Sequence, residues 1–197
     1  MEAVGEYGGL ALDQEKPLDE IGSGYTYFRD DDVVVAKITP CFENGKGALA
    51  KGLKNGIAFG TTELHVLRAR ENMDPGFLFY LTISDAFRDM GEAHMYGAGG
   101  QKRVPELFIR DLRSPVPPAE EQRKIALFLD RKTGEIDKLI RKREELLAVQ
   151  REKRMAMVTH AVTQGFATST DFTQTSIPWL QKIPAHWRLV PLKWCCH

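Results

Sequence analysis

Short hydrophobic runs separated by turn residues mark the first part of the chain. The run DDVVVAKI at 31–38 places β-branched residues after an acidic turn, which predicts a buried strand. Residues 57–69 (IAFGTTELHVLRA) predict a further pair of strands. Residues 75–91 (PGFLFYLTISDAFRDMG) show apolar positions at helical spacing that end in a glycine. We therefore expect residues 1–117 to form a small mixed domain of short strands and helices.

The pattern changes after three prolines in the segment SPVPP at 114–118. Pro117 and Pro118 stand where the first turn of a helix tolerates proline, and two glutamates follow closely. Apolar residues then recur at near-heptad spacing, while lysine, arginine and glutamate occupy the other positions. The apolar positions are Ile125, Leu129, Ile136, Leu139, Ile140, Leu146, Leu147, Val158 and Val162. The pattern predicts one long coiled-coil-type helix over 118–164, which Gly165 is expected to end.

Two features bear on the role of this helix. Gly134 costs about 1 kcal/mol relative to alanine in a helix interior, so we expect a bend there, or a restart with Thr133 as N-cap. A helix of about 45 residues at ~1.5 Å per residue is about 70 Å long, which exceeds the width of the preceding domain. Its narrow apolar stripe must be buried on another helix or a partner chain. We expect a spacer and an interaction surface; a helix folded back on its own domain is the alternative.

The last part of the chain departs from both patterns. Residues 165–177 are polar, poor in charge and without periodicity, which is typical of a linker. Residues 178–197 are rich in tryptophan and proline and are expected to be only the beginning of a further domain. The expected fold class is α+β, with a small mixed domain followed by a long helix.

Composition and charge narrow the classes of function. No apolar run approaches the roughly 20 residues needed to span a bilayer, the acidic N-terminus is unlike a signal peptide, and three cysteines suit a reducing cytoplasm. The formal net charge is zero. However, nine acidic and two basic residues fall within 1–32, whereas 37–54 holds four lysines and one glutamate. Because charge is segregated in this way, a zero total does not exclude a nucleic-acid partner.

Two glycine-rich loops carry the candidate contacts to a nucleic acid. In PCFENGKGALAKGLKNG (40–56), three lysines can approach phosphates and an asparagine can read a base edge. A solvated lysine loop is the alternative. In GAGGQKRVP (97–105), glutamine and arginine are the usual readers of adenine and guanine, and a structural role is the alternative. The candidate residues are Asn44, Lys46, Lys51, Lys54, Gln101, Lys102 and Arg103.

Several other polar residues favour a structural interpretation. Thr61, Thr62 and Glu63 lie between two expected strands and are typical of a turn, with a polar contact as the alternative. His65 falls within a strand pattern and is expected to be a packed histidine. The segment CCH at 195–197 does not have the spacing of a zinc site, so no metal is expected.

The chain lacks the motifs of an enzyme that acts on DNA. A magnesium-dependent nuclease would place a carboxylate two residues before a strand lysine, but Val35 occupies that position before Lys37. No glycine-rich cofactor loop follows a strand, and no Asn/Asp-Pro-Pro-aromatic motif for base methylation occurs. We therefore expect neither catalysis nor a bound cofactor.

The order of several motifs resembles the specificity subunit of type I restriction–modification systems. These motifs are FRDDDVVVAKITPCFENGKGA, GTTELHVLRA, GAGGQKRVP, PVPPAEEQRKIALFLDRKTGEIDKLIRKREELL, EKRMAMVTHAVTQG and IPAHWRLVPLK. The resemblance implies a target recognition domain in 1–117 that binds half of a bipartite site in double-stranded DNA. It also implies that the helix sets a spacing and docks the modification (methyltransferase) subunit. S-adenosylmethionine, ATP and magnesium are then expected on the modification and restriction subunits only, with this chain as their non-catalytic, cytoplasmic partner.

The same resemblance implies a partial copy. Residues 1–117 lack the Trp/Pro opening segment that IPAHWRLVPLK resembles, so the chain is similar to the rear of one recognition domain, the central helical region and, at 178–197, the start of a second recognition domain. In this family the segment 97–105 is present whatever the target, which favours positioning over base choice. Two alternatives stay open: a homodimer that pairs its helices antiparallel, and an inactive remnant acting only as a helical interaction protein.

Overall fold

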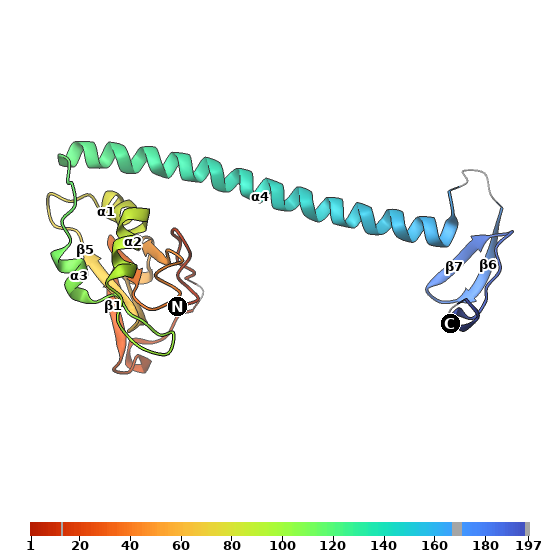
Figure 1. Ribbon diagram of the computed structural model, residues 1–197, viewed down its shortest axis with the longest axis horizontal. Coiled ribbons are helices and arrows are strands. Elements are labelled where there is room, and N and C mark those ends of the chain that lie inside the picture. Colours follow the sequence, from red (N-terminus) through yellow and green to blue (C-terminus); the bar gives the residue numbers. More distant parts are fainter. Residues whose placement is uncertain (13, 167–170, 196–197) are drawn as a thin grey trace. The chain divides into compact units, whose positions relative to one another are not determined.

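The computed structural model describes residues 1–12, 14–166 and 171–195, and the chain divides into two compact units, Met1–Thr133 and Gly134–His197 (Figure 1). The first unit contains short strands, short helices and the beginning of a long helix. The second contains the rest of that helix and a pair of strands. The chain therefore has the expected α+β composition.

A three-stranded antiparallel sheet forms the centre of the first unit. Strand β2 (Asp32–Ala36) lies between β3 (Gly47–Leu49) and β5 (Leu64–Arg68), with Val34 opposite both Ala48 and Val66. Strand β1 (Tyr25–Arg29) pairs with β4 (Ile57–Thr61) in a separate antiparallel sheet. Short 3₁₀ turns cover Leu18–Glu20 and Lys54–Gly56. The buried strand at 31–38 and the strand pair at 57–69 are thus confirmed.

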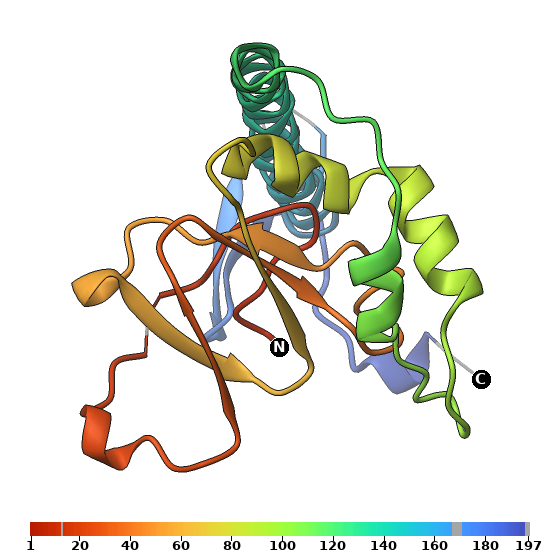
Figure 2. The same cartoon turned by 90° about the vertical axis from the view of Figure 1, so that its left-hand side faces the viewer.

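Both faces of β2 are covered, which explains its unbroken apolar run. Successive side chains of a strand point to opposite faces. Val34 accordingly packs in one cluster with Phe28 and Leu64. Val33 and Val35 pack in a second cluster with ring side chains from the short helices. Those ring side chains are Phe79, Phe87 and Phe108, and Figure 2 shows the three short helices gathered on one side of the strands.

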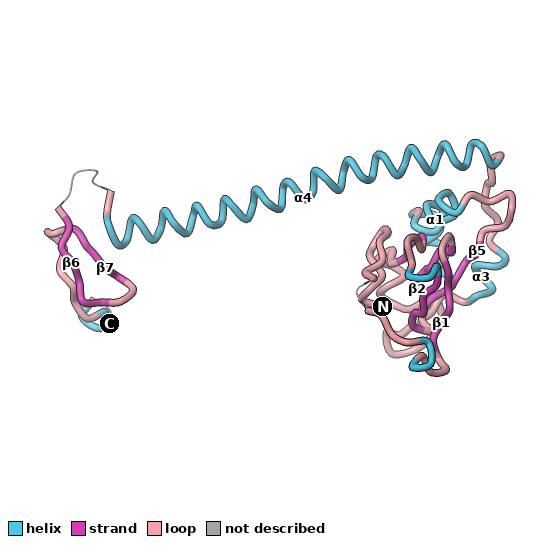
Figure 3. Tube along the Cα trace, turned by 180° about the vertical axis from the view of Figure 1, so that it is seen from behind, coloured by secondary structure: helices cyan, strands magenta, loops and turns pink. Residues whose placement is uncertain are grey.

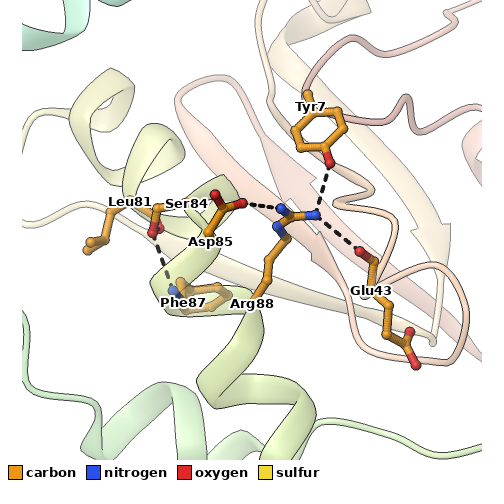
Figure 4. Close-up of polar contacts among 7 residues, drawn as sticks. All are labelled: Tyr7, Glu43, Leu81, Ser84, Asp85, Phe87 and Arg88. Carbon is orange, nitrogen blue, oxygen red and sulfur yellow. Dashed lines mark hydrogen bonds and ion pairs between the residues drawn. The ribbon is translucent and has the colours of Figure 1, made fainter.

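The segment 75–91 is helical, as its spacing predicts, but it forms two helices and Gly91 does not end the second. Helix α1 spans Pro75–Ile83 and helix α2 spans Asp85–Ala93. Ser84 between them has an extended backbone (ψ 148°), and its hydroxyl accepts a hydrogen bond from the Phe87 amide at 3.3 Å (Figure 4). A serine N-cap competes with helix continuation in this way. Gly91 lies inside α2, where a Cβ would come within 2.3 Å of the Phe42 ring.

A single long helix, α4 (Ala119–Gln164), follows α3 (Glu106–Asp111) and the proline segment. Its 46 residues are helical throughout, including Gly134. Thr133 is not an N-cap, because its hydroxyl donates to the Leu129 carbonyl at 2.9 Å, so no helix restarts there. Gly165 has φ +75°, the left-handed conformation in which helices end at glycine. None of the helices in the described ranges is long and apolar enough to cross a membrane.

The second unit contains a strand hairpin that the sequence pattern did not indicate. Strands β6 (Phe172–Ile177) and β7 (Leu180–Pro184) pair antiparallel, with Thr173 opposite Ile183, and a 3₁₀ turn covers Leu192–Trp194 (Figure 3). Residues 172–177 thus form a strand within the segment 165–177, in which the sequence suggests a linker. Most β6 side chains are exposed, so no alternation of apolar and polar residues marks this strand.

Candidate nucleic-acid and partner interface

The lysine loop 40–56 lies against acidic residues of the N-terminal segment. The Asn44 side-chain amide donates to the Glu6 carboxylate at 3.3 Å. Lys46 is half-buried, and its backbone pairs with that of Glu6. Lys51 and Lys54 are exposed, and the Lys54 ammonium forms an ion pair with Glu15. The loop thus presents its cations beside carboxylates rather than as an isolated basic patch.

Arg88 in α2 fixes this loop to the rest of the unit, as Figure 4 shows. Its guanidinium donates to the Tyr7 hydroxyl at 2.9 Å and to the Glu43 backbone carbonyl at 3.1 Å, and it pairs with the Asp85 carboxylate. It also lies over the Tyr7 ring, 5.1 Å from the centroid. Arg88 therefore joins the N-terminal segment, the lysine loop and α2.

The second candidate loop is the tip of a hairpin. Tyr96 and Arg103 form a hydrogen-bonded pair, with N–O distances of 3.2 and 2.9 Å, and residues 97–102 connect them. Figure 2 shows this connection between α2 and α3 extending away from the strands. Gln101 and Lys102 are exposed at the tip, whereas Arg103 at its base is half-buried. The structure thus separates the three candidates by position.

Arg103 is occupied by an internal partner. Its guanidinium donates to both carboxylate oxygens of Glu63, at 2.9 to 3.2 Å, and to the Gln101 carbonyl at 3.2 Å. The hydrogen bond from Arg103 lowers the pKa of Glu63, against an opposing contribution from burial. Glu63 also lies in the turn between β4 and β5, as the sequence predicts. Thus Glu63 serves in both a turn and a polar contact.

His65 is a packed residue, in agreement with the sequence interpretation. Its Nε2 lies 2.9 Å from the Val104 carbonyl oxygen. Burial lowers the pKa of His65, and the hydrogen bond to Val104 opposes that shift in part. A neutral imidazole that donates Nε2–H to a carbonyl fits this position.

The joint between the domain and α4 contains a buried glutamine that the sequence analysis did not single out. The Gln122 residue is 1% exposed. Its side-chain carbonyl accepts from the Asp74 amide at 2.8 Å, and its amide donates to the Asn72 and Pro117 carbonyls at 3.1 and 2.8 Å. The spacing of Gln122 could have indicated its burial. It stands three residues before Ile125 and seven before Leu129, so it lies on the side of the helix that carries the apolar stripe.

Further contacts hold the first turns of α4 against α1. A Cβ at Gly76 would lie 3.1 Å from the Ala126 Cβ, so the two helices approach closely. The Tyr80 hydroxyl donates to the Asp130 carboxylate at 2.8 Å and lies 3.3 Å from the Thr133 hydroxyl. The domain and the start of α4 therefore form one packed body within the first unit.

The remainder of α4 exposes apolar side chains. Ile125 and Leu129 are half-buried. The other seven predicted packing residues are 49–67% exposed, namely Ile136, Leu139, Ile140, Leu146, Leu147, Val158 and Val162. Apolar surface on this scale is typical of an interaction site.

A metal site finds no support in the described part of the chain, where no three His, Cys, Asp or Glu residues are grouped to hold an ion. The thiols of Cys41 and Cys195 are not in disulfides. Cys196 and His197, which complete the CCH segment, lie outside the described residues.

Comparison with curated proteins identifies a set of relatives. The chain is 46% identical over 117 residues to the EcoEI type I restriction enzyme specificity subunit of Escherichia coli, covering 58% of this chain and 20% of that protein. The EcoAI specificity subunit of the same organism is 45% identical over 113 residues, with 57% and 19% coverage. A putative MjaX specificity subunit of Methanocaldococcus jannaschii is 24% identical over 161 residues, with 82% and 36% coverage. The first two matches thus span about a fifth of the relatives' length, and no family model matches the chain.

Solved structures show the same fold. The HsdS subunit of Thermoanaerobacter tengcongensis superposes with a TM-score of 0.61 at 23% identity, covering 95% of this chain and 44% of that one. A chain from a structural study of type I R-M system assembly and conformational transition gives a TM-score of 0.57 at 25% identity, with 71% and 35% coverage. The chain is therefore homologous, over the matched part of its length, to the specificity subunits of type I restriction enzymes.

Proposed function

We propose that this chain is a non-catalytic DNA-recognition element of a type I restriction–modification complex. Residues 1–117 would bind half of a bipartite site in double-stranded DNA, and the helix from 118 to 164 would dock the modification subunit. Residues 165–177 would connect this helix to the start of a second recognition domain at 178–197. The observation that carries the proposal is the 46% identity to a specificity subunit over 117 residues.

The exposed stripe on α4 supports docking of a partner. At 100° per residue, Ile136, Ile140, Leu147 and Val158 fall within about 40° of one another around the helix. Leu139 and Leu146 form an adjacent row. In proteins most of the stability of a helix comes from packing of its apolar face rather than from propensity, so this exposed stripe is expected to pack against a partner. The modification subunit is the proposed occupant, because the relatives are subunits of multi-subunit restriction enzymes.

Co-purification tests the docking. The wild-type chain, coexpressed with a tagged modification subunit from the same restriction system, is expected to co-purify in a fixed ratio. The variant Leu139→Asn with Leu146→Asn should lose most of the bound subunit, because two apolar side chains leave the stripe.

The matched control is Lys138→Asn with Glu145→Asn, which leaves the net charge unchanged. These two residues lie about 100° around the helix from Leu139 and Leu146, and about 140–180° from the row of Ile136, Ile140, Leu147 and Val158. It should co-purify as the wild type does. If the wild type captures no modification subunit, or both pairs behave alike, docking through this stripe is wrong. A chain that forms only homodimers in light scattering would instead favour a second copy as occupant.

A further inference from the structure

We propose that the outer face of the two-stranded ribbon of β1 and β4, with Asn55 at one end, enters the major groove of the DNA and selects its sequence. This inference rests on the proposed DNA-binding function and names the residues that choose the target. Tyr25, Tyr27 and Asn55 are the proposed specificity residues. Arg29, on the same face, is the proposed phosphate contact.

The place of the ribbon in the sequence distinguishes it from the two glycine-rich loops. A residue that selects a target has to differ between subunits with different targets, so it should lie outside the motifs on which the resemblance to the family rests. Those motifs include 28–48, 60–69 and 97–105. The ribbon consists of β1 and β4, and parts of both strands lie outside these motifs. The residues outside the motifs that form its outer face and its end are Tyr25, Tyr27, Asn55, Ile57 and Phe59.

The ribbon has one buried face. Phe28 of β1 lies opposite Ala58 of β4, and both pack in the core cluster that contains Val34. The short helices pack on the other side of β2, as Figure 2 shows. The domain therefore holds the ribbon by its inner face and leaves the outer face uncovered by the helices.

The outer face is largely aromatic. Because side chains alternate between the two faces of a strand, the residues next to Phe28 and Ala58 point outward. Tyr25 and Tyr27 are 55% and 45% exposed. The rings of Tyr27 and Phe59 meet edge to face with their centroids 5.6 Å apart. The whole outer face consists of Tyr25, Tyr27, Arg29, Ile57, Phe59 and Thr61.

The shape of the ribbon suits the major groove, which admits a two-stranded β-ribbon. Five residues at ~3.4 Å each make a face about 14 Å long. At ~3.4 Å per base pair, this length matches about four base pairs. Aromatic carbons on such a face can contact thymine methyl groups, and tyrosine hydroxyls can bond to base edges. The groove of duplex DNA is therefore the occupant we assign to this face.

Asn55 is held at one end of the ribbon. It lies in the turn that leads into β4, with φ 55°. Two hydrogen bonds join this turn to the end of β1: the Asp30 amide donates to the Gly56 carbonyl at 3.0 Å, and the Asp30 carboxylate accepts from the Leu53 amide at 3.0 Å. The Asn55 residue is exposed. Since asparagine can bond to adenine through two atoms, Asn55 is placed to read a base at the edge of the face.

The charges near the ribbon favour selection over general attraction to DNA. Arg29 is the single charged residue among the six of the outer face. The carboxylates nearby in sequence are Asp19, Glu20, Asp30, Asp31 and Asp32. Asp30 and Asp32 accept hydrogen bonds within the domain, whereas the others are exposed. Because these carboxylates repel phosphates, the proposal assigns most phosphate contacts to the modification subunit and base selection to the ribbon.

The test is library selection by the chain bound to its modification subunit. The wild-type complex first enriches a duplex from randomised sequences. Asn55→Gly should lower the affinity for that duplex about fivefold or more, because it removes a pair of hydrogen bonds to a base. Glycine adopts the same positive φ, so the melting temperature should match the wild type. Repeating the selection with Asn55→Gly and with Tyr25→Ala should change the preference at different base pairs, because the two residues lie at opposite ends of the ribbon.

Two further variants separate selection from general binding. Arg29→Gln should weaken binding to the enriched duplex and to a scrambled duplex by similar factors, with the base preference unchanged, because a phosphate contact carries no sequence information. Tyr96→Ala is the matched control for Tyr25→Ala, since Tyr96 is an exposed tyrosine outside the ribbon. It should leave the base preference unchanged. A preference altered by Tyr96→Ala as much as by Tyr25→Ala would refute the assignment to the ribbon.

The outcomes separate the two levels of the proposal. If the wild-type complex enriches no sequence, the proposed function fails and the inference with it. If it enriches a sequence but Asn55→Gly and Tyr25→Ala keep the wild-type preference, only the inference fails. If Tyr25→Ala releases the modification subunit and leaves the preference unchanged, the outer face is a protein interface and the inference is wrong.

Discussion

At the scale of single residues, Gln122 is the buried polar contact between α4 and the domain. Replacing it with alanine removes three hydrogen bonds that the buried Gln122 side chain makes to the Asp74 amide and to the carbonyls of Asn72 and Pro117, and it leaves a space where that side chain was packed. We expect Gln122→Ala to lower the free energy of unfolding by about 2–4 kcal/mol. Arg123→Ala, an exposed neighbour on the same turn, is the control and should change it by less than about 0.5 kcal/mol. Urea denaturation of both variants measures the difference.

Asp32 gives a prediction about pH. Its side chain is 1% exposed and accepts two bonds from the Arg68 guanidinium at 2.7 Å and one from the Arg29 amide at 2.9 Å. Burial opposes ionisation, but the bonds from Arg68 and Arg29 outweigh it and lower the pKa of Asp32 below its ordinary value. A carboxylate of this kind stabilises the fold above the ordinary carboxyl pKa, and the contribution is lost as the pH falls through the lowered value.

The measurable consequence is a stability gap that depends on pH. At pH 7 the variant Asp32→Asn should unfold at a lower denaturant concentration than the wild type. The gap should narrow as the pH falls below about 4, where the carboxyl of the unfolded chain protonates, and it should close as the pH passes through the lowered pKa of the folded state. A gap that is constant from pH 7 to pH 3 would contradict the assignment of the ion pair as the cause.

Individual side-chain partners were beyond the reach of the sequence pattern. The pattern identified Arg103 as a candidate, but its pairing with Glu63 joins residues 40 positions apart. Gln122 looked like one of many polar residues on a charged helix, because its burial depends on the loop at Asn72–Asp74. The packed state of His65 was predictable, since a histidine within a strand pattern is more often packed than a ligand.

At the scale of elements, Ser84 divides one apolar segment into two helices. Its hydroxyl accepts from the Phe87 amide and donates to the Leu81 carbonyl at 2.8 Å. Ser84→Ala should therefore lower the free energy of unfolding by about 1 kcal/mol, the usual cost of losing an N-cap. Ser114→Ala is the control, because the half-buried Ser114 hydroxyl makes only a 3.4 Å bond to the adjacent Pro115 carbonyl, and it should leave the unfolding free energy unchanged within error.

The type of an element could be predicted where hydrophobic periodicity was strong. It could not be predicted where a strand is defined by its backbone pairing with another strand. The run Val33–Val35 and the apolar stripe of α4 predict a buried strand and a long helix without further information. The strand β6 has mostly exposed side chains and is defined by its pairing with β7. The break at Ser84 lay inside an apolar pattern that continued across it, so periodicity alone suggested one helix.

At the scale of the whole molecule, the zero net charge conceals an uneven distribution. Acidic residues of the N-terminal segment are in contact with the lysine loop, which removes much of its attraction for DNA. We therefore expect weak binding of scrambled duplex and a shallow dependence on salt. Raising the salt concentration fourfold, from 50 to 200 mM, should reduce affinity for scrambled duplex by less than the 10³-fold expected of a protein with six or more phosphate contacts. Titrations at the two concentrations measure the slope.

The homology to specificity subunits supports the central proposal, that this chain selects a DNA sequence on behalf of partner subunits. The most direct measurement is library selection by the wild-type chain in complex with the modification subunit, with the modification subunit alone as control. The account predicts enrichment of one short, defined sequence that the modification subunit alone does not enrich. If no sequence is enriched, and the modification subunit recovers the same mixture of duplexes with and without the chain, the proposed role in sequence selection is wrong.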